Sequence, residues 1–323
     1  MVIQTAFGPL KRLTFFLNQP TDLMLRMTVN RARRKEGKMK RELARQSTRS
    51  LGSRNRLSLV SGTQFAVDTV KIELKNVNFA YEQSPAPVLK NLSVQFAQGQ
   101  MYAFVGKPHQ GKATLLKILG QVIVPPTGQG EAFVPPHLRI LHVGREVHVL
   151  KQPFFRNIIF NQTLEQVGGW TRIMDVCKLC GFSSKMLRHL EAERSAHERG
   201  EAEAANASWH KAFAESDRAR LNLARVFVMN AECLVMHLPL VAFSDKETID
   251  MVQLMRTHID NRGLELPPEQ REFRRPRTLF FTSSALNRCN LADVVYDVCV
   301  DKGMEIIGGQ QFVKLASSRD ELG

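Results

Sequence analysis

The chain has 323 residues, of which 43% are hydrophobic and 24% charged, a composition that fits a soluble globular protein and excludes a disordered or fibrous one. Five cysteines, an odd number in a chain this long, do not suggest a disulfide framework and favour a reducing compartment. The chain has no apolar run of about 18 residues, as a membrane-spanning helix needs, and its N-terminus has no clear signal peptide.

The net charge of +14 is concentrated at the N-terminus. Residues 1–60 hold 14 Lys and Arg against three acids, which accounts for eleven of the fourteen net charges. Few apolar side chains accompany them, so this stretch is not expected to build a core. We therefore predict that residues 1–66 form a basic, flexible N-terminal arm.

From about residue 70 the pattern is that of strands and helices. "VKIELKNVNFAY" (70–81) alternates between apolar and polar residues and predicts a half-buried strand, which "SPAP" (84–87) should end. "VLKNLSVQFAQGQ" (88–100) predicts another strand and a turn, and "MYAFVG" (101–106) a buried strand. "KATLLKILGQVI" (112–123) has helical spacing, with one apolar stripe formed by Leu115, Leu116, Leu119 and Val122.

The second half of the chain continues this alternation. Residues 138–144, 232–243 and 277–284 contain short apolar runs typical of buried strands, and residues 294–309 predict a closing hairpin. Residues 165–230 are predicted to be mainly helical, and residues 265–276 to form an exposed loop. Cys177 and Cys180 lie in the helical stretch without a second ligand pair, which argues against a zinc site. Strands separated by helices indicate an α/β fold with a largely parallel sheet.

The segment "GKPHQGKAT" (106–114) almost matches a phosphate-binding loop, and it lies between a predicted strand and a predicted helix. Gly106, Gly111 and Lys112 are the residues that such a loop uses to hold phosphate through backbone N–H groups and an ammonium. Ala113 replaces the hydroxyl residue that binds Mg²⁺. Thr114 carries a hydroxyl, but one step along a helix rotates it by about 100°. The pattern therefore predicts phosphate binding without a good Mg²⁺ site.

These pieces, in their order and spacing, resemble the nucleotide-binding domain of an ABC transporter, of the subclass in which this domain follows a membrane domain. "VNFAY…VLKNLSVQFAQGQMYAFVGKPHQGKATLLK" resembles the family's opening, and "LNLARVFVMNAECLVMHLP" its later core helix and strand. The resemblance implies a P-loop NTPase-like α/β core with a mixed or parallel sheet, an N-terminal antiparallel β part and a helical subdomain at about 160–225. We assign residues 67–314 to this domain and 315–323 to a C-terminal tail.

The resemblance also implies ATP as the cofactor. Tyr81 matches the aromatic residue that stacks on adenine, although a half-exposed strand tyrosine is an equal alternative. Pro108 has no N–H to offer a phosphate, and His109 replaces a glycine. The residues expected to hold the phosphates are Gly106, Lys107, Pro108, His109, Gln110, Gly111, Lys112, Ala113 and Thr114.

The residues that carry hydrolysis in this family do not match. His237 and Leu238 take the places of its two strand-end carboxylates, Arg145 that of a glutamine, and Ser283 that of a histidine that contacts phosphate. In the signature loop, "FAESD" (213–217), Glu215 and Ser216 take the place of both glycines, and the carboxylates of Glu215 and Asp217 would repel a partner's triphosphate. We therefore predict no catalytic residue and no metal ligand.

We accordingly predict a domain that binds ATP weakly, lacks a working hydrolysis site and acts as a non-catalytic or regulatory partner in transmembrane transport. Its expected partners are a second such domain and a transmembrane domain on another chain or a longer parent. It would lie at the cytoplasmic face of a membrane as a peripheral protein, with residues 1–60 on the anionic surface. One alternative is an active ATP-hydrolysing subunit. Another is a scaffold or nucleic-acid-binding protein acting through the arm, although the arm has few aromatic residues to stack on bases.

Overall fold

The computed structural model describes residues 2–18, 21–50, 69–82, 84–160, 162–201, 209 and 213–308. The expected domain boundary at residue 66 and the tail 315–323 lie outside this part of the chain. Within the described residues, no helix combines the length and apolar character that a bilayer span requires.

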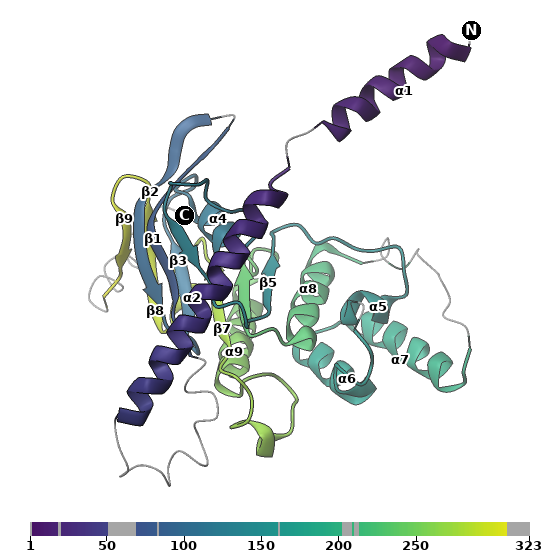
Figure 1. Cartoon of the computed structure of the whole chain (residues 1–323). Helices are drawn as coiled ribbons and strands as arrows, with labels where there is room; N and C mark the ends of the chain where they lie inside the picture. Colours follow the sequence, from purple (N-terminus) through teal and green to yellow (C-terminus); the bar gives the residue numbers. More distant parts are fainter. Residues whose placement is uncertain are drawn as a thin grey trace.

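Two sheets form the centre of the fold (Figure 1). The larger sheet has six strands in the order β5-β6-β7-β3-β8-β9, all parallel to their neighbours except the β8–β9 pair. The smaller sheet has the order β2-β1-β4 and is antiparallel. The bounds of these strands are β1 (Ile72–Tyr81), β2 (Ser84–Phe96), β3 (Met101–Val105), β4 (Glu131–Phe133), β5 (Ile140–Val143), β6 (Cys233–Met236), β7 (Thr278–Thr282), β8 (Val294–Cys299) and β9 (Gly303–Ile306). The predicted α/β fold with its antiparallel part is confirmed.

The central strands are buried on both faces, which explains their continuous apolar sequences. In β3, Tyr102 and Phe104 pack into the core between the two sheets, whereas Met101, Ala103 and Val105 pack into the core under the helices. The first core also contains Phe96 and Phe280, whose ring centroids are 5.0 Å apart in an edge-to-face arrangement. Side chains therefore alternate between two separate cores along one strand.

Helices cover the sheets and extend the domain to one side. A short helix, α4 (Lys112–Leu119), follows the glycine loop, and α9 (Asp245–Asp260) lies between β6 and β7 in the sequence. The bundle at the side consists of α5 (Phe154–Ile159), α6 (Gly169–Leu179), α7 (Ser184–Glu198) and α8 (Glu215–Met229) (Figure 1). Two 3₁₀ turns, η4 (Pro268–Gln270) and η5 (Leu286–Cys289), lie in the loops beside β7. Cys177 and Cys180 are buried in the core under these helices and pack there as small apolar residues.

Two local predictions were wrong. The stripe on α4 was expected to include Val122, but the helix ends at Leu119 and Val122 is 41% exposed. Gly120 follows, where an added Cβ would lie 2.7 Å from the His142 imidazole, so the chain turns closely against β5. The first strand, β1, ends at Tyr81 as predicted, but "SPAP" lies in β2 and not between two strands. Its prolines are tolerated because β2 lies at the edge of its sheet.

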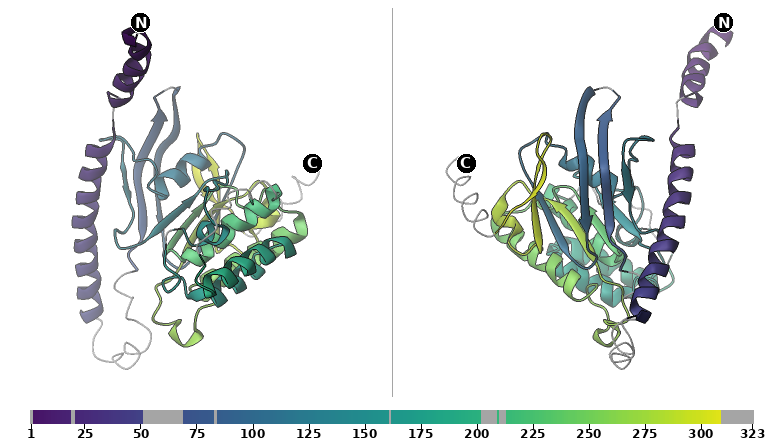
Figure 2. Two further views of the ribbon diagram at one scale, coloured as in Figure 1. Left: turned by 90° about the vertical axis from the view of Figure 1, so that its right-hand side faces the viewer. Right: turned by 60° about the vertical axis from the view of Figure 1, so that its left-hand side comes forward.

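Within the predicted arm, residues 2–17 and 23–50 are helical. Helix α1 (Val2–Leu17) stands away from the domain, whereas α2 (Leu23–Ser50) runs along the smaller sheet (Figure 2). Arg33 is 5% exposed, and its Nε donates to the Ala132 carbonyl at 3.0 Å. Lys40 forms an ion pair with Glu73 at 2.6 Å, and its Nζ lies 4.0 Å from the Phe133 ring centroid. Residues 23–50 therefore form a helix whose polar side chains are partly buried against the domain.

Helix α2 also reaches the end of α4. The guanidinium of Arg26 donates to the carbonyls of Gln121, at 3.0 Å, and of Val122, at 2.6 Å. These carbonyls follow the helix that carries the glycine loop at its start. The contact therefore ties the N-terminal segment to the element that positions the loop.

Candidate functional site

The residues singled out in the sequence lie at the ends of four neighbouring strands. Strands β5, β6, β7 and β3 are neighbours and run parallel, so the loops that follow them meet at one edge of the sheet. The glycine loop follows β3, Arg145 follows β5, His237 follows β6 and Ser283 follows β7. The predicted site residues on these loops are therefore close neighbours.

The glycine loop has the backbone that its sequence requires. Gly106 and Gly111 have φ angles of 130° and 83°. A Cβ would lie 2.6 Å from the Val298 carbonyl oxygen at Gly106, and 2.7 Å from the Val88 carbonyl oxygen at Gly111. Both positions thus accept only glycine. His109, at φ 62°, adopts the left-handed conformation that a glycine would take without cost.

Lys112 is folded onto the loop that it follows. Its Nζ donates to the carbonyl oxygens of Gly106, at 2.8 Å, and Lys107, at 2.6 Å. Gln110 fixes the other side of the loop, because its Oε1 accepts a hydrogen bond from the Val300 N–H at 2.9 Å. The ammonium and the first N–H groups of α4 are thus placed beside one another, which suits a phosphate group.

Tyr81 lies beside the start of α4. Its hydroxyl is 3.2 Å from Thr114 Oγ1, and its ring is 38% exposed. Phe79 supports the ring edge-to-face at 5.0 Å, and Lys117 Nζ lies 6.0 Å from its centroid. Tyr81 is therefore next to the glycine loop, with part of its ring left open. Thr114 is 5% exposed and bonded to Tyr81, so its hydroxyl does not replace the one missing at Ala113.

His237 and Leu238 are held by Thr282, a residue that the sequence analysis did not single out. Thr282 Oγ1 accepts the Leu238 N–H at 2.8 Å and lies 2.9 Å from His237 Nδ1. Because that oxygen already accepts one bond, its own proton suits Nδ1 of a neutral imidazole. Burial first, and then the charges of Lys112, His142, Arg145 and Lys117, lowers the pKa of His237. The groups that lower the pKa of His237 are thus three cations and the ionisable imidazole of His142.

This donor set does not fit Mg²⁺, which needs several oxygen ligands. Ala113 has no oxygen, His237 and Arg145 present nitrogen, and Leu238 is apolar. Arg145 is exposed. The side chains at these positions therefore do not supply the oxygen ligands of a magnesium site.

Ser283 is also unavailable to a ligand. It is 5% exposed, and its hydroxyl donates to the Ala285 carbonyl at 2.8 Å. The Ala285 N–H in turn lies 3.3 Å from the same hydroxyl. The side chain therefore closes its own turn instead of pointing to the glycine loop.

The signature segment forms the start of α8. Asp217 accepts a bond from the Ala214 N–H and lies 3.4 Å from the Arg220 guanidinium. This carboxylate therefore caps its own helix, which corrects the expectation that both acids would face a partner. Glu215 is exposed and borders a cavity of about 390 Å³ that also includes Arg145, Arg218 and Leu238 in its lining.

Comparison with known proteins agrees with this geometry. The family model "ABC transporter" matches residues 89–239. The glutathione/L-cysteine transport system ATP-binding/permease protein CydC of Haemophilus influenzae is 24% identical over 216 residues, which are 62% of this chain and 34% of that protein. The ATP-dependent lipid A-core flippase of Syntrophus aciditrophicus is 30% identical over 98 residues, 29% of this chain and 15% of that protein. The chain thus spans about a third or less of the length of these relatives.

Solved structures share the fold at low sequence identity. A bacterial ABC transporter cassette in dimeric form superposes with a TM-score of 0.54 at 15% identity, covering 74% of this chain and 99% of the cassette. A bacterial Atm1-family ABC exporter with ATP bound gives a TM-score of 0.56 at 15% identity, covering 79% of this chain and 43% of the exporter. The family model, the relatives and the shared fold together show that this chain carries an ABC transporter nucleotide-binding domain.

Proposed function

We propose that this domain binds ATP weakly, does not hydrolyse it, and acts as a non-catalytic or regulatory partner domain in transmembrane transport. One observation carries the proposal: Gly106 and Gly111 have the positive φ angles that a phosphate-binding loop would need, while His237 and Leu238, held by Thr282, follow β6 where carboxylates would be needed for hydrolysis. The domain can therefore recognise a nucleotide without activating water.

The binding half of the proposal rests on the loop. Gly106, Gly111 and Lys112 have the conformations and the charge that a phosphate chain requires. Tyr81 lies where an adenine could stack beside α4. Binding is expected to be weak because Pro108 offers no N–H, and because Lys112 must leave two carbonyls to reach a phosphate.

The partner half rests on the relatives. The names of the two relatives above describe an ATP-binding/permease protein and a flippase, and the solved cassette is dimeric. A second nucleotide-binding domain and a transmembrane domain, on another chain or a longer parent, are accordingly the proposed partners. An active ATP-hydrolysing subunit remains the alternative that activity measurements must test.

Replacing the loop lysine should weaken ATP binding strongly. Calorimetry on the full chain should detect a weak complex, and Lys112→Ala should lower the affinity at least about tenfold because it removes the phosphate-facing charge. Lys246→Ala is the matched control, since it removes an equal charge from an exposed position on α9. Equal binding by wild type and Lys112→Ala, or no binding by either, would contradict the proposed use of the loop.

We also propose that the domain lies on the cytoplasmic face of a membrane through α2. Four basic residues of α2, Arg31, Arg34, Lys35 and Lys38, are exposed at helical spacing. Helix α1, which precedes α2 and extends away from the domain, exposes Leu13, Phe16 and Leu17 by 54–75% (Figure 1). A basic helix preceded by a helix with exposed apolar side chains suits an anionic lipid surface.

Vesicle sedimentation tests this location. The full chain should bind vesicles that contain phosphatidylserine, and Gln replacements at Arg31, Arg34, Lys35 and Lys38 should weaken binding more than about tenfold, at about 1 kcal/mol for each basic residue. The control carries Gln at four exposed basic residues elsewhere: Lys71, Arg188, Lys246 and Lys302. An equal loss in both variants would show a net-charge effect and would refute the assignment to α2.

A further inference from the structure

The same site suggests which ionic form of the nucleotide it takes. We propose that the site binds nucleotide as the metal-free polyphosphate, with Lys112, Lys117 and Arg145 supplying the positive charge that Mg²⁺ would otherwise supply. The inference rests on the proposed nucleotide binding and adds that Mg²⁺ competes with the protein for the phosphates. It therefore predicts that added Mg²⁺ weakens binding.

The first step of the argument concerns oxygen donors. The hydroxyls of Thr114 and Thr282, as candidate metal ligands, are both engaged. Thr114 Oγ1 lies 3.2 Å from the Tyr81 hydroxyl, and Thr282 Oγ1 is used by the Leu238 N–H and by His237. Mg²⁺ accepts few ligands other than oxygen and demands a near-octahedral set. These residues do not provide that set.

The carboxylate of Asp297 approaches the loop at Gly106. Its Oδ1 would lie 3.0 Å from a Cβ built on Gly106. Asp297 is on β8, however, and β8 and β7 flank β3 on opposite sides. His237 and Arg145 follow strands on the β7 side of β3. Asp297 is therefore separated by the loop strand from the positions at which carboxylates would serve a bound metal.

The second step concerns the positive charges. Lys112 and Lys117 are both on α4, and Lys117 also lies 6.0 Å from the Tyr81 ring centroid. The His237 N–H donates to the Val143 carbonyl at 2.9 Å, which places His237 directly beside the end of β5 and hence near Arg145. The lowered pKa of His142, caused by burial and then by Lys117, agrees with this placement. Lys112 and Lys117 thus lie on the helix that follows the glycine loop, and Arg145 on the loop after β5, where Glu146 and Glu215 line the same cavity.

The third step compares the two forms of the ligand. A free nucleoside triphosphate carries about four negative charges at neutral pH and its Mg²⁺ complex about two, so a cationic site attracts the free form more strongly. Arg145 is suited to this role because a guanidinium can contact phosphate oxygens in a bidentate manner. In a metal complex, the same guanidinium would face a cation of like charge. Both effects favour the metal-free ligand.

Binding in two buffers tests the inference. Calorimetry on the full chain with ATP, at equal ionic strength, should give a dissociation constant about tenfold lower in EDTA than in excess MgCl₂. Tripolyphosphate should compete with ATP in EDTA, since the phosphate chain carries the recognised charge. Tighter binding in MgCl₂ would overturn the inference and leave the proposed function standing. No ATP binding in either buffer would overturn both.

Two variants sharpen this test. Arg145→Gln should weaken binding in EDTA several-fold and reduce the difference between the buffers, whereas Lys246→Ala should leave both unchanged. The double variant Ala113→Ser with His237→Asp supplies two oxygen ligands and should reverse the preference, so that MgCl₂ strengthens binding. A thermal melt of each variant checks that it is folded. An unchanged buffer preference in the folded Arg145→Gln variant would refute the role of this arginine and with it the proposal.

Discussion

Incubated with ATP and Mg²⁺, the full chain should release phosphate no faster than its Lys112→Ala variant. Hydrolysis requires a cation, a polarised water and contacts to the transferred phosphate at the same time. Leu238 cannot accept a proton from water, and the neighbouring His237 has a lowered pKa and a hydrogen bond to Thr282. Loss of a general base alone typically lowers a rate about 10²- to 10⁴-fold.

This result separates the proposed function from its main alternative. Phosphate release is to be measured over hours at saturating ATP, with and without EDTA, to remove contributions from contaminating enzymes. Turnover that needs Mg²⁺ and disappears in Lys112→Ala would establish an active ATPase with unusual ligands. Replacing Leu238 by Glu alone should not restore turnover, because the oxygen ligands for a metal would still be absent.

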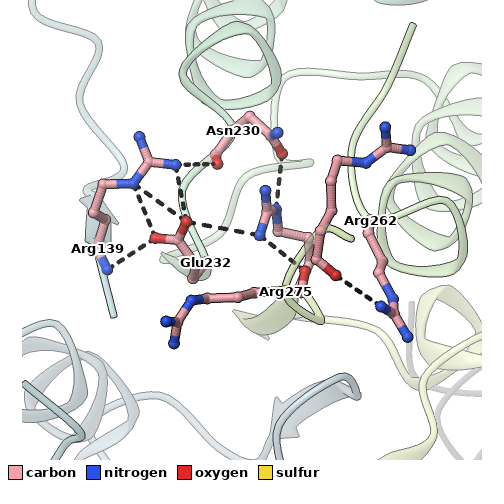
Figure 3. A network of polar contacts seen from close by, with 7 residues as sticks. Arg139, Asn230, Glu232, Arg262 and Arg275 are labelled. Atoms are coloured by element: carbon pink, nitrogen blue, oxygen red, sulfur yellow. Dashed lines mark hydrogen bonds and ion pairs between the residues drawn. The ribbon is translucent and has the colours of Figure 1, made fainter. Parts of the chain in front are cut away.

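Removing the carboxylate of Glu232 should destabilise the domain by about 3 kcal/mol, the usual cost of leaving a buried cation without its partner. Glu232 precedes β6 and is 9% exposed. It receives hydrogen bonds from the Arg139 guanidinium and backbone (Figure 3). It also lies 3.7 Å from Arg277, which is 4% exposed. Glu232→Gln keeps the shape and removes the charge.

Denaturant unfolding of this variant should show a lower midpoint at an unchanged slope. The control is Glu191→Gln, an exposed acid on α7 that lies 4.0 Å from Arg194 and should have little effect.

The pH dependence of the stability gives a second check. Burial by itself would raise the pKa of Glu232, but the bonds from Arg139 outweigh it and lower the pKa. Its contribution is therefore complete above the usual glutamate pKa and is lost as the pH falls through the lowered value. A wild-type midpoint matched by Glu232→Gln at pH 7 would contradict this account.

The sequence allowed the fold to be predicted wherever burial produces a simple pattern. The runs at β3, β6 and β7 are largely apolar because both faces of these strands are covered, and the β8–β9 hairpin follows from a turn at Asp301–Gly303. The glycine loop was predictable because Gly106 and Gly111 are required by backbone conformation. Positions of this kind are set by local backbone geometry, so the residue type at each of them indicates the structure directly.

Helix α2 could not be predicted in the same way. Its inward face includes Arg26, Arg33 and Lys40, whose polar ends reach carbonyls and a carboxylate, so burial there does not produce an apolar stripe. The spacing of Arg26, Arg33, Gly37 and Lys40 is helical, and Gly37 allows close contact with Pro136, where a Cβ would lie 2.9 Å from Cδ. A solvated basic helix can have the same spacing, so the sequence indicates packing only when the domain surface that α2 contacts is known.

The site itself was predicted only in part. The residues at the strand ends were assigned correctly to their strands, but Thr282, which orients His237 and Leu238, was not singled out. Nor did the sequence show that Asp217 bonds to its own helix or that Ser283 closes its own turn. These are interactions between side chains and nearby backbone, and a residue type alone does not determine which partner it finds.

The position of Lys112 has a thermodynamic consequence. Its ammonium already donates to the carbonyls of Gly106 and Lys107. The arrival of an anion is an exchange, in which two existing hydrogen bonds are given up for new ones. Each hydrogen bond from a charged group contributes about 1.5–3 kcal/mol net, so much of the free energy gained from the ligand is offset. Affinity for a ligand must then come mainly from the groups around the lysine. A weakly charged ligand is not expected to gain enough free energy from the loop alone to bind.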